Sequence, residues 1–507
     1  MFDELPDSAS RADLDDAAVV SAIKGWTRAV ATAAAHRLAF IAELTSRRYD
    51  EDWDVSEEAC DAWDSAASEV CAASGISQGR ASKDMEVGAA LCARLPKVAA
   101  LFLAGQISEL LVRRIVHRTS LMQDRGLLAE LDAVIADRAV NWGALSQKKL
   151  DEAIDVWVDR YDPGALRHSR NQAQGREVGF GNNDSGTTEI SGRLLGADAA
   201  LVDRRLTLMA KGVCEDDPRT FKQRRADALG ALGAGSTHLG CQCGSPNCPA
   251  AEDDGRASSV VVHIYAEQAA MAAEPDALKD GEGAVPDDEE ADTPQNPSRA
   301  TDPESSSTRA PAAVVPGFGI VPAPLLAALI AAGAKVRQVK APAVDPENKY
   351  RISTALGEFV RARDLTCRFP NCDRPADFGD LDHTVAWVQG GPTHASNLKG
   401  YCRIHHLVKT FRSGWSDKQL PDGTVVITSP TGHTYTTKPG SALLFPAVNI
   451  TSAPVTPDAP QAGGGGDRTV AMPKRKRSRA KERAYRIKAE RARNDAHVAE
   501  RNQPPPF

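Results

Sequence analysis

The chain has 507 residues, of which 42% are hydrophobic and 25% charged, with a formal net charge of -7. This length predicts two or three folded units joined by linkers, and ten cysteines in so long a chain exclude a small disulfide scaffold. Residues 252–304 are strongly acidic and residues 474–493 strongly basic, so the mild net charge says little about partners.

The N-terminal residues carry no signal for export or membrane insertion. Residues 1–16 are acidic and lack the basic and then apolar segments of a secretory signal, which predicts a cytoplasmic protein with reduced thiols. The uncharged segment 311–334 is interrupted by Pro316, Pro322 and Pro324. About eleven helical residues remain, ~16 Å long, against the ~30 Å of a bilayer core. We therefore expect a linker and a buried helix there, and no membrane partner.

Residues 1–250 are predicted to form a mainly α-helical domain, because apolar residues recur at spacings of three and four. The clearest helix spans residues 13–48, with acidic residues at its start and Arg47 and Arg48 at its end, as the helix dipole favours. The role of this domain is left open, as is the oligomeric state, with a dimer through the helical domain as one option.

Residues 97–119 predict two helices joined at Ala104 and Gly105. Two interpretations stay open: a helical hairpin within the bundle, or a helix-turn-helix that reads DNA. In the second case the recognition helix would carry four basic residues, namely Arg113, Arg114, His117 and Arg118.

The stretch "THLGCQCGSPNC" places four potential metal ligands close together in the chain. They are His238, Cys241, Cys243 and Cys248. Three or four of them could converge on a zinc ion, or they could form a redox-active or merely exposed thiol cluster. Isolated cysteines elsewhere are expected to be small buried hydrophobes. These are Cys60, Cys71, Cys92 and Cys214.

Residues 251–315 are expected to hold one short strand, in "SSVVVHIYA", followed by an acidic disordered linker that cannot bury enough apolar surface to fold. Order should return in residues 316–446. There the stretch 420–439 predicts a β-hairpin with turns at Asp422-Gly423 and at Pro430-Thr431-Gly432. A flexible linker, 447–472, and a disordered basic tail, 473–507, should follow.

A second set of potential zinc ligands forms two close pairs, one in "CRFPNC" and one in "CRIH". The ligands are Cys367, Cys372, Cys402 and His405. Such pairs are typical of closed tetrahedral structural sites. If residues 402–411 are helical, successive side chains diverge by about 100°, so His405 and His406 cannot bind the same metal. His406 should instead share a helix face with Lys409.

A divalent metal site and a general base are predicted near His406. Leu381 to Trp387 reads as a short strand that carries Asp382 and His383. The Asp382 carboxylate and the His406 imidazole suit a hard cation such as Mg²⁺ or Mn²⁺. His383 could then deprotonate a water molecule that attacks phosphorus. Asn397 could orient the His383 ring through a side-chain hydrogen bond.

These residues resemble a known nuclease motif. Residues 363–415 resemble an HNH endonuclease, the ββα-metal family named for its His, Asn and His, which fall here at His383, Asn397 and His406. The resemblance implies a hairpin and a helix clamped around one divalent metal, braced by zinc, that cut phosphodiester bonds in DNA. The zinc would be held at the Cys and His positions named above, with histidine in place of the commoner cysteine as the last ligand.

The similarity extends over most of the chain, to an actinobacterial HNH endonuclease family sometimes called a mycobacterial repeat family. Its members join a helical N-terminal domain to such a module. The expected fold class is therefore a mainly α N-terminal domain plus a small α+β C-terminal module with a ββα-metal fold. A zinc-stabilised DNA-binding protein of mobile-element origin, with a vestigial nuclease site, is the competing hypothesis.

The tail and the predicted catalytic helix supply basic residues that would contact DNA. They are Lys409, Lys474, Arg475, Lys476 and Arg477. Lys and Arg at this density neutralise backbone phosphates without reading sequence. The alternative for the tail is a solvated helix without a partner.

Overall fold

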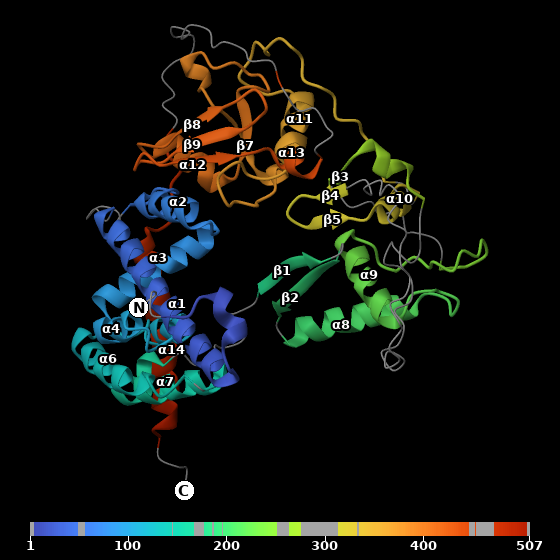
Figure 1. Cartoon of the computed structure of the whole chain (residues 1–507). Coiled ribbons are helices and arrows are strands. Elements are labelled where there is room, and N and C mark those ends of the chain that lie inside the picture. Colours follow the sequence, from blue (N-terminus) through green and yellow to red (C-terminus); the bar gives the residue numbers. More distant parts are fainter. Residues whose placement is uncertain are drawn as a thin grey trace.

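The computed structural model describes residues 5–48, 56–143, 145–166, 177–184, 187–194, 196–250, 263–274, 313–331, 334–445, 452 and 471–503. Most of the predicted acidic linker and nearly all of the linker predicted at 447–472 lie outside these residues, and so does most of the strand predicted in "SSVVVHIYA". The described part is mainly helical, with small antiparallel sheets in the C-terminal half and one β-hairpin before it (Figure 1).

Helices α1 to α7 form a bundle around one hydrophobic core. Their bounds are α1 (Asp16–Arg47), α2 (Ala62–Ser74), α3 (Gln78–Ala93), α4 (Pro96–Leu103), α5 (Glu109–Arg118), α6 (Arg125–Ala139) and α7 (Gln147–Tyr161). Local sequence explains several helix starts, since Asp15 accepts a hydrogen bond at the start of α1 and Asp61 forms a capping box with Asp64 at the start of α2. The long helix predicted at 13–48 is confirmed.

Helices α4 and α5 form a hairpin inside this bundle. Arg113 of α5 pairs with Asp84 at 2.6 Å, and Arg114 pairs with Asp151 at 2.6 Å. The Arg118 guanidinium also pairs with an acidic residue of α7. Because these arginines are bound by neighbouring helices, the structure favours the hairpin over a recognition helix presented to DNA.

The middle of the chain holds two small units with cores of their own. The first is the hairpin β1 (Glu177–Asp184) and β2 (Thr187–Arg193) with α8 (Gly196–Lys211) and α9 (Phe221–Gly233). The second is a sheet of β3 (Tyr265–Ala266), β4 (Ala313–Val315) and β5 (Gly319–Val321), covered by α10 (Ala323–Ala331). Helix α10 is the helix predicted after the prolines. Among the described residues, no helix has both the length and the apolar character that a membrane crossing requires.

Residues 354–444 form a compact C-terminal module. Its elements are α11 (Thr354–Asp364), β6 (Asp380–His383), β7 (Leu398–Tyr401), α12 (Arg403–Phe411), β8 (Ser416–Gln419), β9 (Val425–Thr428), β10 (Thr434–Thr437) and α13 (Gly440–Leu444). Strands β6 and β7 pair antiparallel, and a second antiparallel sheet has the order β10-β9-β8. The predicted hairpin at 420–439 is confirmed by β9 and β10.

A buried ion cluster fastens α11 to β7. The Asp364 carboxylate accepts hydrogen bonds from Arg363 at 2.7 Å and from the backbone N–H of Gly400 at 2.8 Å. Burial opposes ionisation of Asp364, but the guanidinium groups of Arg363 and Arg368 outweigh it and hold the pKa of this carboxyl below its usual range. The cluster fixes the strand on which the candidate site is built.

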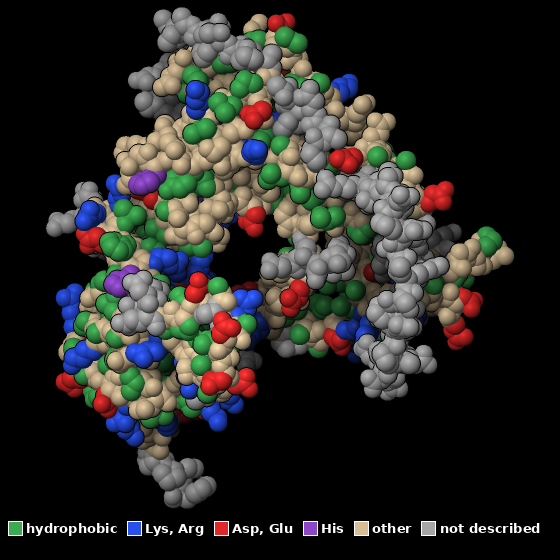
Figure 2. All heavy atoms as spheres, viewed as in Figure 1, with side chains coloured by type: hydrophobic (Ala, Val, Ile, Leu, Met, Phe, Trp, Pro, Cys, Tyr) green, Lys and Arg blue, Asp and Glu red, His purple; other side chains and the backbone are tan. Residues whose placement is uncertain are grey.

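The module rests on the helical bundle through α12 and α2. The indole of Trp415 donates to Ser65 Oγ at 3.0 Å, and the Asn371 side chain donates to the carbonyl oxygen of Cys71 at 3.1 Å. Arg412, directly after α12, also hydrogen-bonds Glu58, which precedes α2. Figure 1 shows α2 directly beside α12, and Figure 2 shows a group of Lys and Arg side chains lower on the same face of the bundle, near α3.

The expectation of a disordered tail is wrong, because residues 479–501 form helix α14 (Arg479–Arg501), which lies against the bundle (Figure 1). Arg475 and Arg479 both bind the carboxylates of Asp61 and Asp64 at the start of α2. At the far end, Arg491 pairs with Asp162 and Asn494 bonds to backbone carbonyls of residues 164 and 166. The acidic partners lie hundreds of residues away in sequence, so the basic composition alone could not identify them.

We expect the double substitution Arg475→Ala and Arg479→Ala to lower the free energy of unfolding by about 3 kcal/mol, because it strands two buried carboxylates. Asp61 is 1% exposed at its side chain and Asp64 10%. Urea unfolding followed by circular dichroism would measure the change. Lys488→Ala, an exposed residue of the same helix, is the control. Equal stability of the two variants would contradict the docking of α14.

Candidate functional site

The candidate site lies where β6, β7 and α12 meet in the C-terminal module. Asp382 of β6 faces Lys399 of β7 across the antiparallel pair. Asp380 and Asp382, two apart on one strand, point to the same face, and α12 packs on this face through contacts with both carboxylates. The arrangement is a two-stranded antiparallel sheet followed by a helix.

His406 is held between these two carboxylates. Its Nδ1 atom lies 2.8 Å from Asp380 Oδ2, and its Nε2 atom lies 3.6 Å from Asp382 Oδ1. Burial opposes ionisation of Asp380, but hydrogen bonds from His406 and Arg403 hold the pKa of this carboxyl below its usual range. Sequence reasoning missed Asp380, although the alternation in "DLDH" places it on the same strand face as Asp382.

Two ammonium groups bind the Asp382 carboxylate. Lys399 Nζ and Lys409 Nζ each lie 2.9 Å from Asp382 Oδ2. Burial would raise the pKa of Asp382, but the two lysines outweigh it and keep the pKa lowered. Lys399 is fully buried, and its second partner, Asp417, lies at 3.0 Å. Sequence reasoning missed both Lys399 and Asp417.

Lys409 was expected to contact DNA, and the structure gives it a different role. Its Nζ atom donates to the carbonyl oxygen of His383 at 2.6 Å as well as to Asp382. The ammonium group therefore ties α12 to the end of β6. Because its hydrogen bonds are used within the module, we no longer place Lys409 among the DNA contacts.

His383 is buried at the end of β6. Its Nε2 atom lies 3.0 Å from Thr393 Oγ1, and the Tyr350 ring stacks on the imidazole with centroids 5.6 Å apart. Burial lowers the pKa of His383, with Asp382 acting in the opposite direction. The imidazole is thus favoured in its neutral form, in which one nitrogen can accept a proton.

The expected contact between Asn397 and the His383 ring is not what the structure shows. The Asn397 side chain accepts from the N–H of Val385 at 2.8 Å and donates to the carbonyl oxygens of Val385 and Pro392. It therefore closes the loop between β6 and β7. That loop carries Thr393, so Asn397 positions His383 through the loop rather than by touching the ring.

The two close pairs of Cys and His converge on one point beside α12. The ligand atoms of Cys367, Cys372, Cys402 and His405 all lie within 4.8 Å of one another. His405 Nδ1 lies 3.3 Å from Cys402 Sγ and 3.5 Å from Cys367 Sγ. Three thiols and one imidazole in this arrangement could hold a structural metal such as zinc.

The surroundings of His405 agree with a metal ligand. Its ring stacks on Phe369 with centroids 3.9 Å apart, and it is 1% exposed. Burial of an imidazole whose Nδ1 is aimed at thiols is costly unless that nitrogen has a strong partner. His405 and His406 point to different centres, as expected for consecutive helical residues.

The second cysteine cluster forms with a different membership from the one expected. The structure brings together Cys214, Cys241, Cys243 and Cys248, all half-buried, with their Sγ atoms within 4.8 Å. His238 is not in this group, and Cys214 is not the isolated buried residue that was expected. Cys214 lies before α9, whereas the other three cysteines follow it. Only the fold brings Cys214 to them, so the local sequence pattern does not reveal it as a member of the cluster.

The predicted DNA contacts of the tail divide into two kinds. Arg475 is bound by Asp61 and Asp64, as described above, so in the structure it holds the tail against the bundle. Lys474, Lys476 and Arg477 remain exposed. The Arg477 guanidinium also lies over the Tyr485 ring at 4.4 Å.

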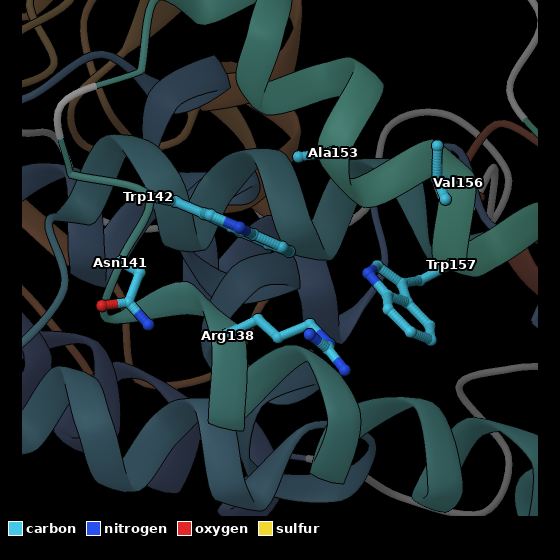
Figure 3. Close-up of a pocket in the computed structure, with 6 residues that line it drawn as sticks. All are labelled: Arg138, Asn141, Trp142, Ala153, Val156 and Trp157. Carbon is cyan, nitrogen blue, oxygen red and sulfur yellow. The ribbon is translucent and has the colours of Figure 1, made fainter.

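A surface hollow of about 310 Å³ lies in the helical bundle, between α6 and α7 (Figure 3). Arg138 and Trp157 both line it, and the guanidinium carbon of Arg138 lies over the Trp157 ring, 4.4 Å from its centroid. The remaining lining comes from Asn141, Trp142, Ala153 and Val156. These lining residues include no carboxylate and no thiol. Their cationic group, the Arg138 guanidinium, already stacks on the Trp157 ring.

We expect Cys402→Ser to lower bound zinc by one ion per chain and to lower the melting temperature of the module, because structural zinc sites contribute folding energy. Elemental analysis of the purified chain and a thermal melt would measure both. Cys92→Ser is the matched control, since Cys92 is exposed and belongs to neither cluster. Unchanged zinc in Cys402→Ser would exclude the site.

Comparison with known proteins places the chain in a family. "Uncharacterized protein Rv2100" of Mycobacterium tuberculosis is 51% identical over 521 residues, which cover 100% of this chain and 93% of the relative. "Uncharacterized protein Rv3776" of the same species is 49% identical over 514 residues, covering 100% of this chain and 95% of that protein. No solved structure matches the chain. The family model described as "Domain of unknown function (DUF222)" matches residues 26–292, and the chain belongs to this DUF222 family.

Proposed function

We propose that the protein is a metal-dependent HNH endonuclease that hydrolyses phosphodiester bonds in DNA. The observation that carries the proposal is the pair formed by His406 Nε2 and Asp382 Oδ1, 3.6 Å apart, with the buried His383 as the next residue of β6 after Asp382. This constellation stands on a hairpin followed by a helix, which is the arrangement that the resemblance of residues 363–415 implies.

The donor atoms suit a hard divalent cation. An imidazole nitrogen and a carboxylate oxygen that face each other can bind one ion and leave positions for water and phosphate oxygens. Asp380 supports the imidazole through Nδ1, as carboxylates behind metal-binding histidines commonly do. When bound, Mg²⁺ or Mn²⁺ would supply positive charge that stabilises the departing oxygen.

His383 is the residue that we assign as general base. With its Nε2 atom on Thr393, the Nδ1 atom is left to take a proton from water. The water oxygen then bonds to phosphorus while the bond from phosphorus to the leaving oxygen breaks, and that oxygen takes a proton from solvent. General-base catalysis of this kind contributes about 10²- to 10⁴-fold.

Other residues of the module position these groups. Lys399, which is also paired with Asp417, holds the Asp382 carboxylate in position, and Asn397 holds the loop that carries Thr393. Arg403, 57% exposed at its side chain beside Asp380, is suited to contact a backbone phosphate. The exposed Lys474 and Lys476 would extend this contact from the bundle side of the junction.

One observation favours the competing hypothesis of a zinc-stabilised DNA-binding protein with a vestigial site. The ammonium groups of Lys399 and Lys409 both lie 2.9 Å from Asp382 Oδ2. Two such cations reduce the attraction of this carboxylate for a metal ion. Tight binding in a gel-shift assay, with no cleavage in Mg²⁺, Mn²⁺, Ni²⁺ or Ca²⁺, would decide for this hypothesis.

We expect wild-type protein to nick plasmid DNA in Mg²⁺ or Mn²⁺, and His383→Ala to lose at least about 10²-fold of this rate, because the general base is removed. Zinc content should stay unchanged in this variant. His433→Ala provides the matched control, since His433 is an exposed histidine of the same module between β9 and β10. Equal cleavage by wild type and His383→Ala would reveal another base or a contaminant.

The cleavage rate should fall at acidic pH with a midpoint below about 6.5, the usual pKa of histidine. Burial lowers the pKa of His383, so the imidazole is neutral and active above that pKa and is protonated and inactive below it. A single-turnover rate profile between about pH 5 and 8 would measure the midpoint. A midpoint clearly above 6.5 would contradict the assignment of His383 as the base.

A further inference from the structure

We propose that Cys214, Cys241, Cys243 and Cys248 bind a second structural zinc ion, which holds residues 196–250 in their fold. This site lies within the matched DUF222 region and shares no residue with the nuclease module. The proposal therefore concerns the helical part of the chain, for which the nuclease proposal offers no role.

The four sulfur atoms have the spacing of a tetrahedral site. All lie within 4.8 Å of one another, and Cys214 Sγ lies 3.3 Å from Cys241 Sγ. A zinc–sulfur bond of ~2.3 Å in a tetrahedron separates the sulfur atoms by about 3.8 Å. A disulfide would instead bring a pair of sulfur atoms to ~2.05 Å, whereas these four cysteines are free and Cys214 Sγ stays 3.3 Å from Cys241 Sγ. Four converging thiols therefore fit one metal better than paired oxidation.

A buried ion pair brings the two loops of the site together. Cys214 follows α8, whereas the other three cysteines follow α9. Arg219 donates to Asp217 at 2.8 Å and to the carbonyl oxygen of Gly240 at 2.8 Å. The Asp217 carboxylate also accepts from the N–H of Gln242 at 3.0 Å. These bonds join the loop that begins at Cys214 to the residues on either side of Cys241.

The second loop is closed on itself around the cysteines. The N–H of Cys241 donates to the carbonyl oxygen of Ala250 at 2.7 Å, and that of Cys248 donates to Ser245 at 3.2 Å. Gly244 adopts a φ of 70°, a left-handed conformation that glycine allows at low cost. This turn directs Cys248 back toward Cys243, so the backbone is shaped for convergence.

The hydrophobic core of this segment is small. Its buried members are Leu206, Met209, Val213, Ala228 and Leu239. Cys241 is one of the partly buried residues that pack against this group. Segments of this size usually need a disulfide, a metal or a partner in order to fold, because they bury too little apolar surface. A zinc ion at the four thiols would join α8, α9 and the following loop at one point.

The zinc content of the full-length chain tests the proposal. We expect two zinc ions per wild-type chain by elemental analysis, and one in both Cys214→Ser and Cys243→Ser. His238→Ala is the matched control and should keep two, because His238 lies outside the cluster that the structure forms. Unchanged zinc in Cys214→Ser and Cys243→Ser, or loss of zinc in His238→Ala with none lost in Cys214→Ser, would overturn the proposed ligand set.

A second measurement needs no variant that could misfold. In wild-type protein, iodoacetamide labelling followed by peptide mass spectrometry should find the four cysteines protected until a chelator removes zinc. Labelling without chelator, or disulfide-linked peptides in freshly purified protein, would overturn the proposal in favour of a thiol cluster. Both measurements are made without DNA, so a failure of the nuclease proposal leaves their outcome unaffected.

Discussion

The organisation of the C-terminal module depends on the geometry of a single helical turn. Consecutive side chains of α12 diverge by about 100°, so His405 turns toward three cysteines while His406 turns toward β6. The first contact would anchor the helix to the loop around Phe369, and the second presents an imidazole to Asp382. The placement of the candidate site therefore depends on the cluster that binds another face of the same helix.

Buried charges are compensated in a way that links the fold to the candidate chemistry. Lys399 is fully buried between Asp382 and Asp417, which raise its pKa although burial opposes this. A buried ion pair contributes little net stability, but removal of one partner is costly. The carboxylate that we assign to the divalent metal is thus held ionised and fixed in position by the protein itself. The proposed site and the folded module depend on the same residues here.

Local patterns allowed much of the candidate site to be predicted, and long-range contacts account for the rest. The close pairs of Cys and His, the alternation in "DLDH" and the hairpin turns are each set within a few residues, and the structure brings these elements together. Cys214 and the carboxylate partners of Arg475 could not be predicted in the same way, since their neighbours are chosen by the packing of distant elements. Asn397 shows an intermediate case, because its position was identified but its hydrogen bonds depend on how the loop folds.

Because α14 docks on the N-terminal bundle, the order in which the chain is synthesised has a consequence for its folding. Asn494 and Arg491 complete contacts at the far end of α7, although they follow the C-terminal module in the sequence (Figure 1). The α1–α7 bundle is therefore synthesised before the C-terminal module and gains α14 only after it. Until the residues around α14 are made, the carboxylates of Asp61 and Asp64 lack the arginines that bind them in the folded chain. A protein inserted directly after α14 would be carried beside the α1–α7 bundle rather than beside the C-terminal module.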